Sequence, residues 1–153
     1  MTLRARISDA LKQAMRDKAA QRLSTLRLIN AAIKDKDIAA RAGGSDDEGV
    51  PEGEVLAILG KMSKQRIESA RAYEEGGRLD LADREREEIA VIEEFLPQQL
   101  DAKQTDAAVA EAIAEIGATS IRDMGKVMGL LKGKYTGQMD FGSVGPQIKE
   151  RLG

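Results

Sequence analysis

The sequence predicts an all-α protein, and three observations support this. Ala, Leu, Glu, Lys and Arg dominate the 153 residues, and these residues favour helix over strand. Apolar residues recur every three or four positions in one segment after another, which is the helical period. No segment alternates apolar and polar residues between turn signals, as a half-buried strand would. We expect an N-terminal four-helix part over residues 1–97 and a small three-helix tail domain over 98–153.

The first two helices are predicted from their apolar spacing. In the first helix, apolar residues recur every four positions, at Leu3, Ile7, Leu11 and Met15. Thr2 is suited to cap the N-terminus of this helix. The second runs from about residue 21 to 41 and has apolar residues on more than one side. We therefore expect the second helix to be central, with several neighbours.

The third and fourth helices are bounded by loop signals. Residues 43–49 are rich in Gly and acidic residues, and we expect a mobile acidic loop at about 43–53. Pro51 suits the first turn of the third helix, which we expect to end at residues 76–77, two glycines. Asp80 is the expected cap of the fourth helix, and Pro97 closes it.

The last three helices are shorter. The fifth is expected to stop at Gly117, and the sixth to begin with a capping box formed by Ser120 and Asp123. Pro146 is expected in the first turn of the last helix, because proline is tolerated there. That helix should therefore start near residue 142 or 143.

The composition excludes several classes of function. The chain has no Cys, no His and no Trp, so disulfides, cysteine-based sites and a Ser-His-Asp triad are excluded. Only two Tyr and two Phe are present, which disfavours nucleic-acid binding by rows of stacked aromatic side chains. No catalytic constellation is visible, and we predict no catalytic residue, no metal and no cofactor.

The sequence also predicts the compartment. No segment has the ~18 consecutive apolar residues of a membrane span, so no membrane association is expected. The basic N-terminus has no continuous apolar centre, unlike a secretory signal, and Asp9 and Asp17 argue against a transit peptide, which is poor in acids. A cytoplasmic protein is therefore the prediction.

The charge is unevenly distributed although the net charge is only −2. Residues 1–42 hold ten Lys and Arg against four Asp and Glu, whereas residues 43–100 hold seven against fifteen. Residues 101–153 hold seven of each. Such a polarised chain can attract a polyanion on its basic side. Alternatively, the basic helices pair with the acidic ones across the surface.

The sixth helix carries the strongest local feature. Gly125, Gly129 and Gly133 repeat every four residues and so share one helical face. Lys126, Lys132 and Lys134 flank this face in the sequence. A bare face with ammonium groups beside it suits a phosphate backbone, which requires charge and close access. Alternatively, a neighbouring helix packs onto the glycines and the lysines are ordinary solvated residues.

A second feature is a set of polar residues at positions that continue the apolar faces of the predicted helices. Arg66 and Ser69 fall on the apolar line of the third helix, and Asn30 and Arg86 interrupt those of the second and fourth. With Glu68, they predict either a polar cleft that binds a small molecule or a buried structural network.

Several segments together resemble the GatB/YqeY family, specifically its small free-standing YqeY-like members. The matching segments are 25–34 (TLRLINAAIK), 64–69 (KQRIES), 80–82 (DLA) with Glu85 and Glu88, 95–100 (FLPQQL), 124–129 (MGKVMG) and 132–134 (KGK). The resemblance spans nearly the whole chain, and the acidic loop at 43–53 is a departure from it.

This resemblance implies a function without catalysis. The family also supplies the tail of the B subunit of the glutamine-dependent tRNA amidotransferase, where the tail helps to hold tRNA. It therefore implies tRNA contact by Gly125, Lys126, Gly129, Lys132, Gly133 and Lys134. One alternative is a module that docks on a translation or amidotransferase complex. The other is an enzyme using the polar cleft, with the family's carbon–nitrogen ligase activity, glutamine being the amido-nitrogen donor.

Overall fold

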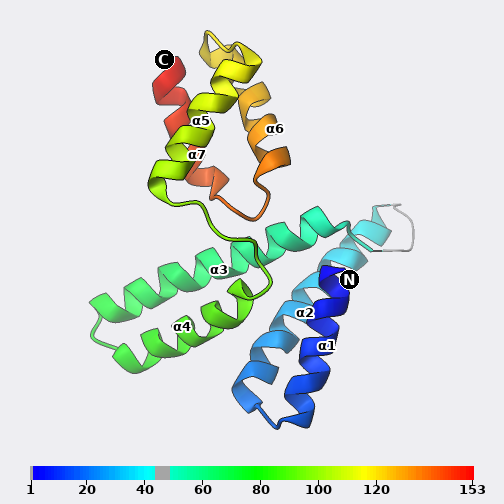
Figure 1. Ribbon diagram of the computed structural model, residues 1–153. Helices are drawn as coiled ribbons and strands as arrows, with labels where there is room; N and C mark the ends of the chain where they lie inside the picture. Colours follow the sequence, from blue (N-terminus) through cyan, green and yellow to red (C-terminus); the bar gives the residue numbers. More distant parts are fainter. Residues whose placement is uncertain (1, 44–48) are drawn as a thin grey trace. The chain divides into compact units, whose positions relative to one another are not determined.

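The computed structural model describes residues 2–43 and 49–153, and over these residues the protein is all-α, with no strand (Figure 1). Residues 44–48 of the expected acidic loop lie outside the described residues. The helices are α1 (Leu3–Arg16), α2 (Ala20–Ala42), α3 (Glu52–Glu75), α4 (Leu79–Glu93), α5 (Ala102–Ile116), α6 (Met124–Lys134) and α7 (Phe141–Leu152). A 3₁₀ turn, η1 (Ile121–Asp123), leads into α6. The predicted fold class is confirmed.

The chain divides into two compact units, Met1–Leu96 and Pro97–Gly153, beside the boundary expected at Pro97. In the N-terminal unit, α2 contacts α1, α3 and α4, as expected of a central helix. The fully buried side chains at the centre of this unit come from all four helices: Ile7, Leu26, Ile29, Val55, Leu59 and Ile92. The expectation that Met15 is buried was wrong, because Met15 is 51% exposed near the end of α1.

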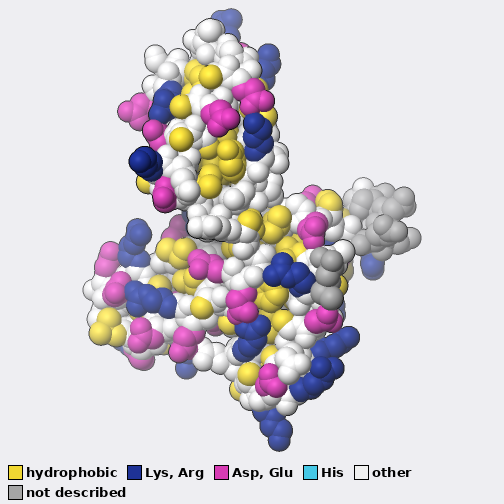
Figure 2. All heavy atoms as spheres, viewed as in Figure 1, with side chains coloured by type: hydrophobic (Ala, Val, Ile, Leu, Met, Phe, Trp, Pro, Cys, Tyr) yellow, Lys and Arg dark blue, Asp and Glu magenta, His cyan; other side chains and the backbone are white. Residues whose placement is uncertain are grey.

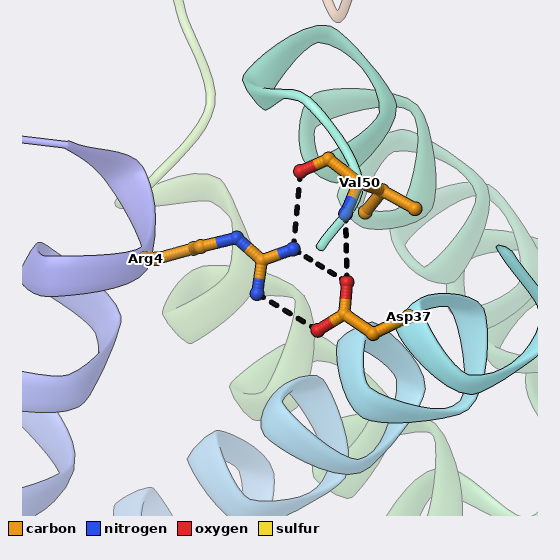
Figure 3. A network of polar contacts seen from close by, with 3 residues as sticks. All are labelled: Arg4, Asp37 and Val50. Carbon is orange, nitrogen blue, oxygen red and sulfur yellow. Dashed lines mark hydrogen bonds and ion pairs between the residues drawn. The ribbon is translucent and has the colours of Figure 1, made fainter. Parts of the chain in front are cut away.

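A polar network joins α1, α2 and the start of α3 (Figure 3). The Arg4 guanidinium donates to both Asp37 carboxylate oxygens, at 2.6 and 2.9 Å, and to the Val50 carbonyl at 3.1 Å. Asp37 Oδ1 also accepts from the Val50 N–H at 2.8 Å. The hydrogen bonds from Arg4 and then from the Val50 N–H lower the pKa of Asp37 from 3.8 to about 2. These contacts fix the chain where it enters α3.

The entry into α3 requires a glycine. Gly49 has φ of +84°, and a Cβ built there would lie 2.7 Å from both Arg4 Nη2 and Asp37 Oδ1. Val50 is buried in the core, and residues 52–53 already belong to α3. The expectation of a loop reaching residue 53 was therefore wrong, because its last residues pack or are helical.

The C-terminal unit is built from α5, α6 and α7 around its own core of Val109, Val127, Leu131, Val144 and Ile148. Asp101 and Gln104 form a capping box at the start of α5, a sequence signal that our prediction missed. Gly117 ends α5 in the left-handed conformation, with φ of +71°, as expected of a C-terminal glycine.

Three helix starts differ from the predictions. Pro51 precedes α3 rather than lying in it, and α4 begins at Leu79, so Asp80 lies in its first turn instead of capping it. Ser120 does not form a capping box for α6. Its Oγ accepts from the Arg122 N–H and caps η1, while the Asp123 carboxylate accepts from the Thr119 N–H. A 3₁₀ turn therefore takes the place of the expected first turn of α6.

The last helix starts earlier than predicted. Asp140 caps α7, which begins at Phe141, so Pro146 lies at its sixth residue rather than in its first turn. Gly145 explains why this is tolerated. The residue before a proline avoids the helical region because its Cβ and N–H meet the proline ring, and glycine has no Cβ.

Candidate nucleic-acid interface

The glycine face of α6 is open. Gly125, Gly129 and Gly133 are exposed, and a Cβ built at any of them would meet no heavy atom of another element within 4 Å. Within the C-terminal unit, no neighbouring helix packs onto these glycines. The three glycines leave a strip of bare helix backbone about 12 Å long, at 1.5 Å per residue.

The opposite face of α6 is the one that packs. Val127 and Leu131 are fully buried in the core of the C-terminal unit. The helix α7 approaches through Gly145, where a Cβ would lie 3.5 Å from the end of Met124 and 3.7 Å from that of Met128. Gly145 thus lies at the contact between α7 and α6, and the three glycines of α6 take no part in this contact.

Two of the three lysines flank the open face. Successive residues of an α-helix turn by about 100°, which places Lys126 and Lys132 along opposite sides of the glycine strip. Both are exposed, and within the described residues neither forms an ion pair. Their ammonium groups are therefore available to an anion that approaches the strip.

The third lysine is placed differently. Lys134 lies across the helix from the glycine strip, and its Nζ is 2.8 Å from the Glu115 carboxylate of α5. The hydrogen bond to Glu115 raises the pKa of Lys134. Lys134 therefore forms an ion pair between α6 and α5.

Arg122 was not among the predicted site residues. It lies exposed in η1, one turn before Lys126, and within the described residues it forms no ion pair. The spacing of four between Arg122 and Lys126 could have indicated it. The site then has a cation at the start of the strip as well as along its sides.

The polar residues predicted to form a cleft are not brought together. Arg66 Nε lies 2.8 Å from Glu88 Oε2 of α4, and Arg66 Nη1 donates to the Met62 carbonyl at 3.2 Å. The side chains of Arg66 and Glu88 are only 16% and 21% exposed. This pair joins α3 to α4 in the manner of a structural network.

The other members lie apart from that pair. Arg86 is exposed, with Glu74 at 2.9 Å and Asp83 at 3.5 Å, so its expected position on an apolar line was wrong. Glu68 is exposed, and Asn30 and Ser69 are half-buried. In the described part of the chain, no hydrogen bond or ion pair joins any of these residues to Arg66.

Among the described residues, no helix is long and apolar enough to cross a membrane. The fold and the site together define a small all-α protein of two helical units, in which the shorter unit presents an open, lysine-flanked helix face.

The chain belongs to the YqeY family, described as Yqey-like protein, whose model matches residues 4–152. This confirms the resemblance inferred from the sequence.

Curated relatives come from fungi and share the name "Altered inheritance of mitochondria protein 41, mitochondrial". The protein of Clavispora lusitaniae is 37% identical over 86 residues, which is 56% of this chain and 46% of that protein. The protein of Vanderwaltozyma polyspora is 33% identical over 100 residues, 61% of this chain and 51% of that protein. The chain thus spans about half the length of the curated relatives that it matches.

Proposed function

We propose that this protein is a non-catalytic accessory module that binds tRNA through the glycine face of α6. The observation that carries the proposal is the open strip at Gly125, Gly129 and Gly133, onto which no other helix of the C-terminal unit packs. Each glycine costs a helix about 1 kcal/mol relative to alanine, and here no packing contact accounts for that cost. Access for a ligand accounts for it.

The flanking charges favour a phosphate backbone as this ligand. Lys126 and Lys132 are point charges on flexible stems, so they suit phosphates without demanding a fixed geometry. The resemblance to the GatB/YqeY family favours tRNA among the nucleic acids, because it implies a relation to the amidotransferase tail that helps to hold tRNA. The amidotransferase's own ligase chemistry is not part of the proposal.

Titration of labelled tRNA at several salt concentrations tests the proposal. Neutralising Lys126 and Lys132 with glutamine should weaken binding. The slope of log K against log salt should also fall by about 1 to 2, because each lost phosphate contact removes roughly 0.7 to 0.9. The matched control is Lys103→Gln with Lys149→Gln, two exposed lysines on α5 and α7 of the same unit. We expect the control to leave the slope nearly unchanged.

The shape of the strip is tested separately. Gly129→Leu places a side chain on the open face and should lower tRNA affinity without unfolding the unit, because the space there is empty. Absence of tRNA binding at low salt, or equal effects of the site and control variants, would refute the proposal. Capture of a specific protein partner that survives nuclease treatment would instead support the docking alternative.

We also propose that the protein acts in the cytoplasm. The fungal relatives carry "mitochondrial" in their names, so fractionation of cells that express the tagged full chain is the test.

A further inference from the structure

The outward face of α2 carries a straight line of cations. Arg27, Lys34 and Arg41 are spaced by seven residues, which is close to two helical turns, so they follow one another along one side of the helix. All three are exposed. At 1.5 Å per residue, the line is about 21 Å long, with cations about 10 Å apart. Figure 2 shows Lys and Arg side chains over the α1–α2 hairpin, with Asp and Glu side chains among them.

Two other cations of this region form ion pairs within the unit. Arg4 is held by Asp37, and Arg22 pairs with Glu94 of α4. The expectation that basic helices pair with acidic ones is thus met by Arg22.

The line itself has no such partner. Within residues 2–43 and 49–153, no ion pair reaches Arg27, Lys34 or Arg41. Arg41 contributes to the lowered pKa of Asp37 only through space, because Arg4 occupies that carboxylate. The other acid of α2, Asp35, lies about a quarter turn from the line. An external anion can therefore reach all three cations.

The surface beside the line indicates the kind of partner. Ser24, Ala31 and Ile38 run parallel to the cations at the same spacing of seven, and all are exposed. Two of these side chains are small, so an extended ligand can approach the helix closely. Ile38, 62% exposed, is the one large apolar side chain on this line, too little to anchor the helix in a lipid surface.

We propose that the outward face of α2 binds the phosphate backbone of RNA, independently of base sequence. Evenly spaced cations along a helix complement a polymer that carries evenly spaced phosphates. Contacts between cations and phosphates do not distinguish one base from another, so the binding is independent of base sequence. This surface lies in the N-terminal unit and is separate from the glycine face of α6. The inference depends on the geometry of α2 and does not rest on the proposed function of α6.

The test is a salt titration of the full chain with two labelled 30-nucleotide RNAs of unrelated sequence. The variant Arg27→Gln/Lys34→Gln/Arg41→Gln should lower the slope of log K against log salt by about 2 to 3. It should weaken binding to both sequences by the same factor. The control, Lys61→Gln/Arg71→Gln/Arg84→Gln, changes three exposed cations of α3 and α4 by the same net charge and should lower the slope far less.

The outcomes are distinguishable. An unchanged slope in the α2 variant, or an equal loss in the control, overturns the α2 surface and indicates a net-charge effect. Loss of binding only in the Lys126/Lys132 variant supports the α6 site and overturns the α2 surface. Loss of binding only in the α2 variant supports the α2 surface and overturns the α6 site. Binding to vesicles of anionic lipid that depends on Arg27, Lys34 and Arg41, without RNA binding, also overturns the proposed RNA-binding surface of α2. Because all six changed side chains are exposed, the helical circular dichroism should stay constant.

Discussion

Replacing Asp37 by asparagine should destabilise the N-terminal unit at neutral pH. Asp37 accepts two hydrogen bonds from Arg4 and one from the Val50 N–H, and these contacts join α1, α2 and the start of α3. Its pKa falls from 3.8 to about 2 on folding. At about 1.4 kcal/mol for each pKa unit, the charged carboxylate contributes at most about 2.5 kcal/mol to the free energy of unfolding.

Solvent reduces this value. The Asp37 side chain is only 14% exposed, but that of Arg4 is 36% exposed, so water screens part of the interaction. We expect Asp37→Asn to lower the free energy of unfolding by about 1 to 2 kcal/mol at pH 7. For a protein of this size, each kcal/mol lowers the unfolding temperature by about 2 to 4 °C.

The pH dependence gives the decisive measurement. Because folding lowers the pKa of Asp37 from 3.8 to about 2, its contribution is present above the unfolded pKa and is lost as the pH falls through the folded pKa. Urea unfolding at pH 7, 4, 3 and 2, followed by circular dichroism, should show the difference between wild type and variant shrinking over this range. A separate transition of the C-terminal unit, where it is resolved, should not move. A difference that is the same at pH 7 and pH 2 would refute the reasoning.

Three further predictions test the packing. Gly49→Ala should destabilise by about 1 to 3 kcal/mol, because it combines positive φ with contacts at 2.7 Å; thermal unfolding measures this, and a neutral effect would contradict it. Gly145→Leu should destabilise the C-terminal unit by about 1 to 3 kcal/mol through overpacking, whereas Gly125→Leu on the open face should not; equal effects would refute the assignment of faces. Arg66→Gln and Glu88→Gln should show a coupling of about 1 kcal/mol in a double-mutant cycle and unchanged RNA binding; additive effects of the two changes on stability would contradict the structural role of this pair.

Local signals predicted much of the fold. Thr2 and Gly117 bound their helices as expected, because each acts through backbone groups of its own turn. The position of Pro146 could not be predicted in the same way. Whether a proline interrupts a helix depends on its neighbours, and Gly145 removes the Cβ that would have opposed it.

Burial was harder to predict than helicity. The helical period identifies which residues share a face, but it does not show where the neighbouring helix ends. Met15 continues the apolar line of α1 but lies near its end, where it is exposed. Arg86 also lies on an apolar face in the sequence pattern and is exposed in the structure, where its side chain pairs with Glu74.

The candidate site shows the same limit. A spacing of four between glycines is compatible with close helix packing and with an open surface, so the sequence left both alternatives. Only the tertiary structure separates them, through the absence of neighbours at Gly129 and their presence at Gly145. Likewise, the pairing of Lys134 with Glu115 depends on how α5 and α6 pack, and no local pattern indicates it.

The contrast between the two kinds of glycine strengthens the functional interpretation. Gly145 lies at the contact between α7 and α6, beside the ends of Met124 and Met128. The three glycines of α6 together cost about 3 kcal/mol of helix stability, a large part of the roughly 5 to 15 kcal/mol that stabilises a typical domain. No contact within the described residues offsets this cost. This uncompensated cost, together with the lysines on either side of the strip, supports the proposal that an anionic ligand approaches this face.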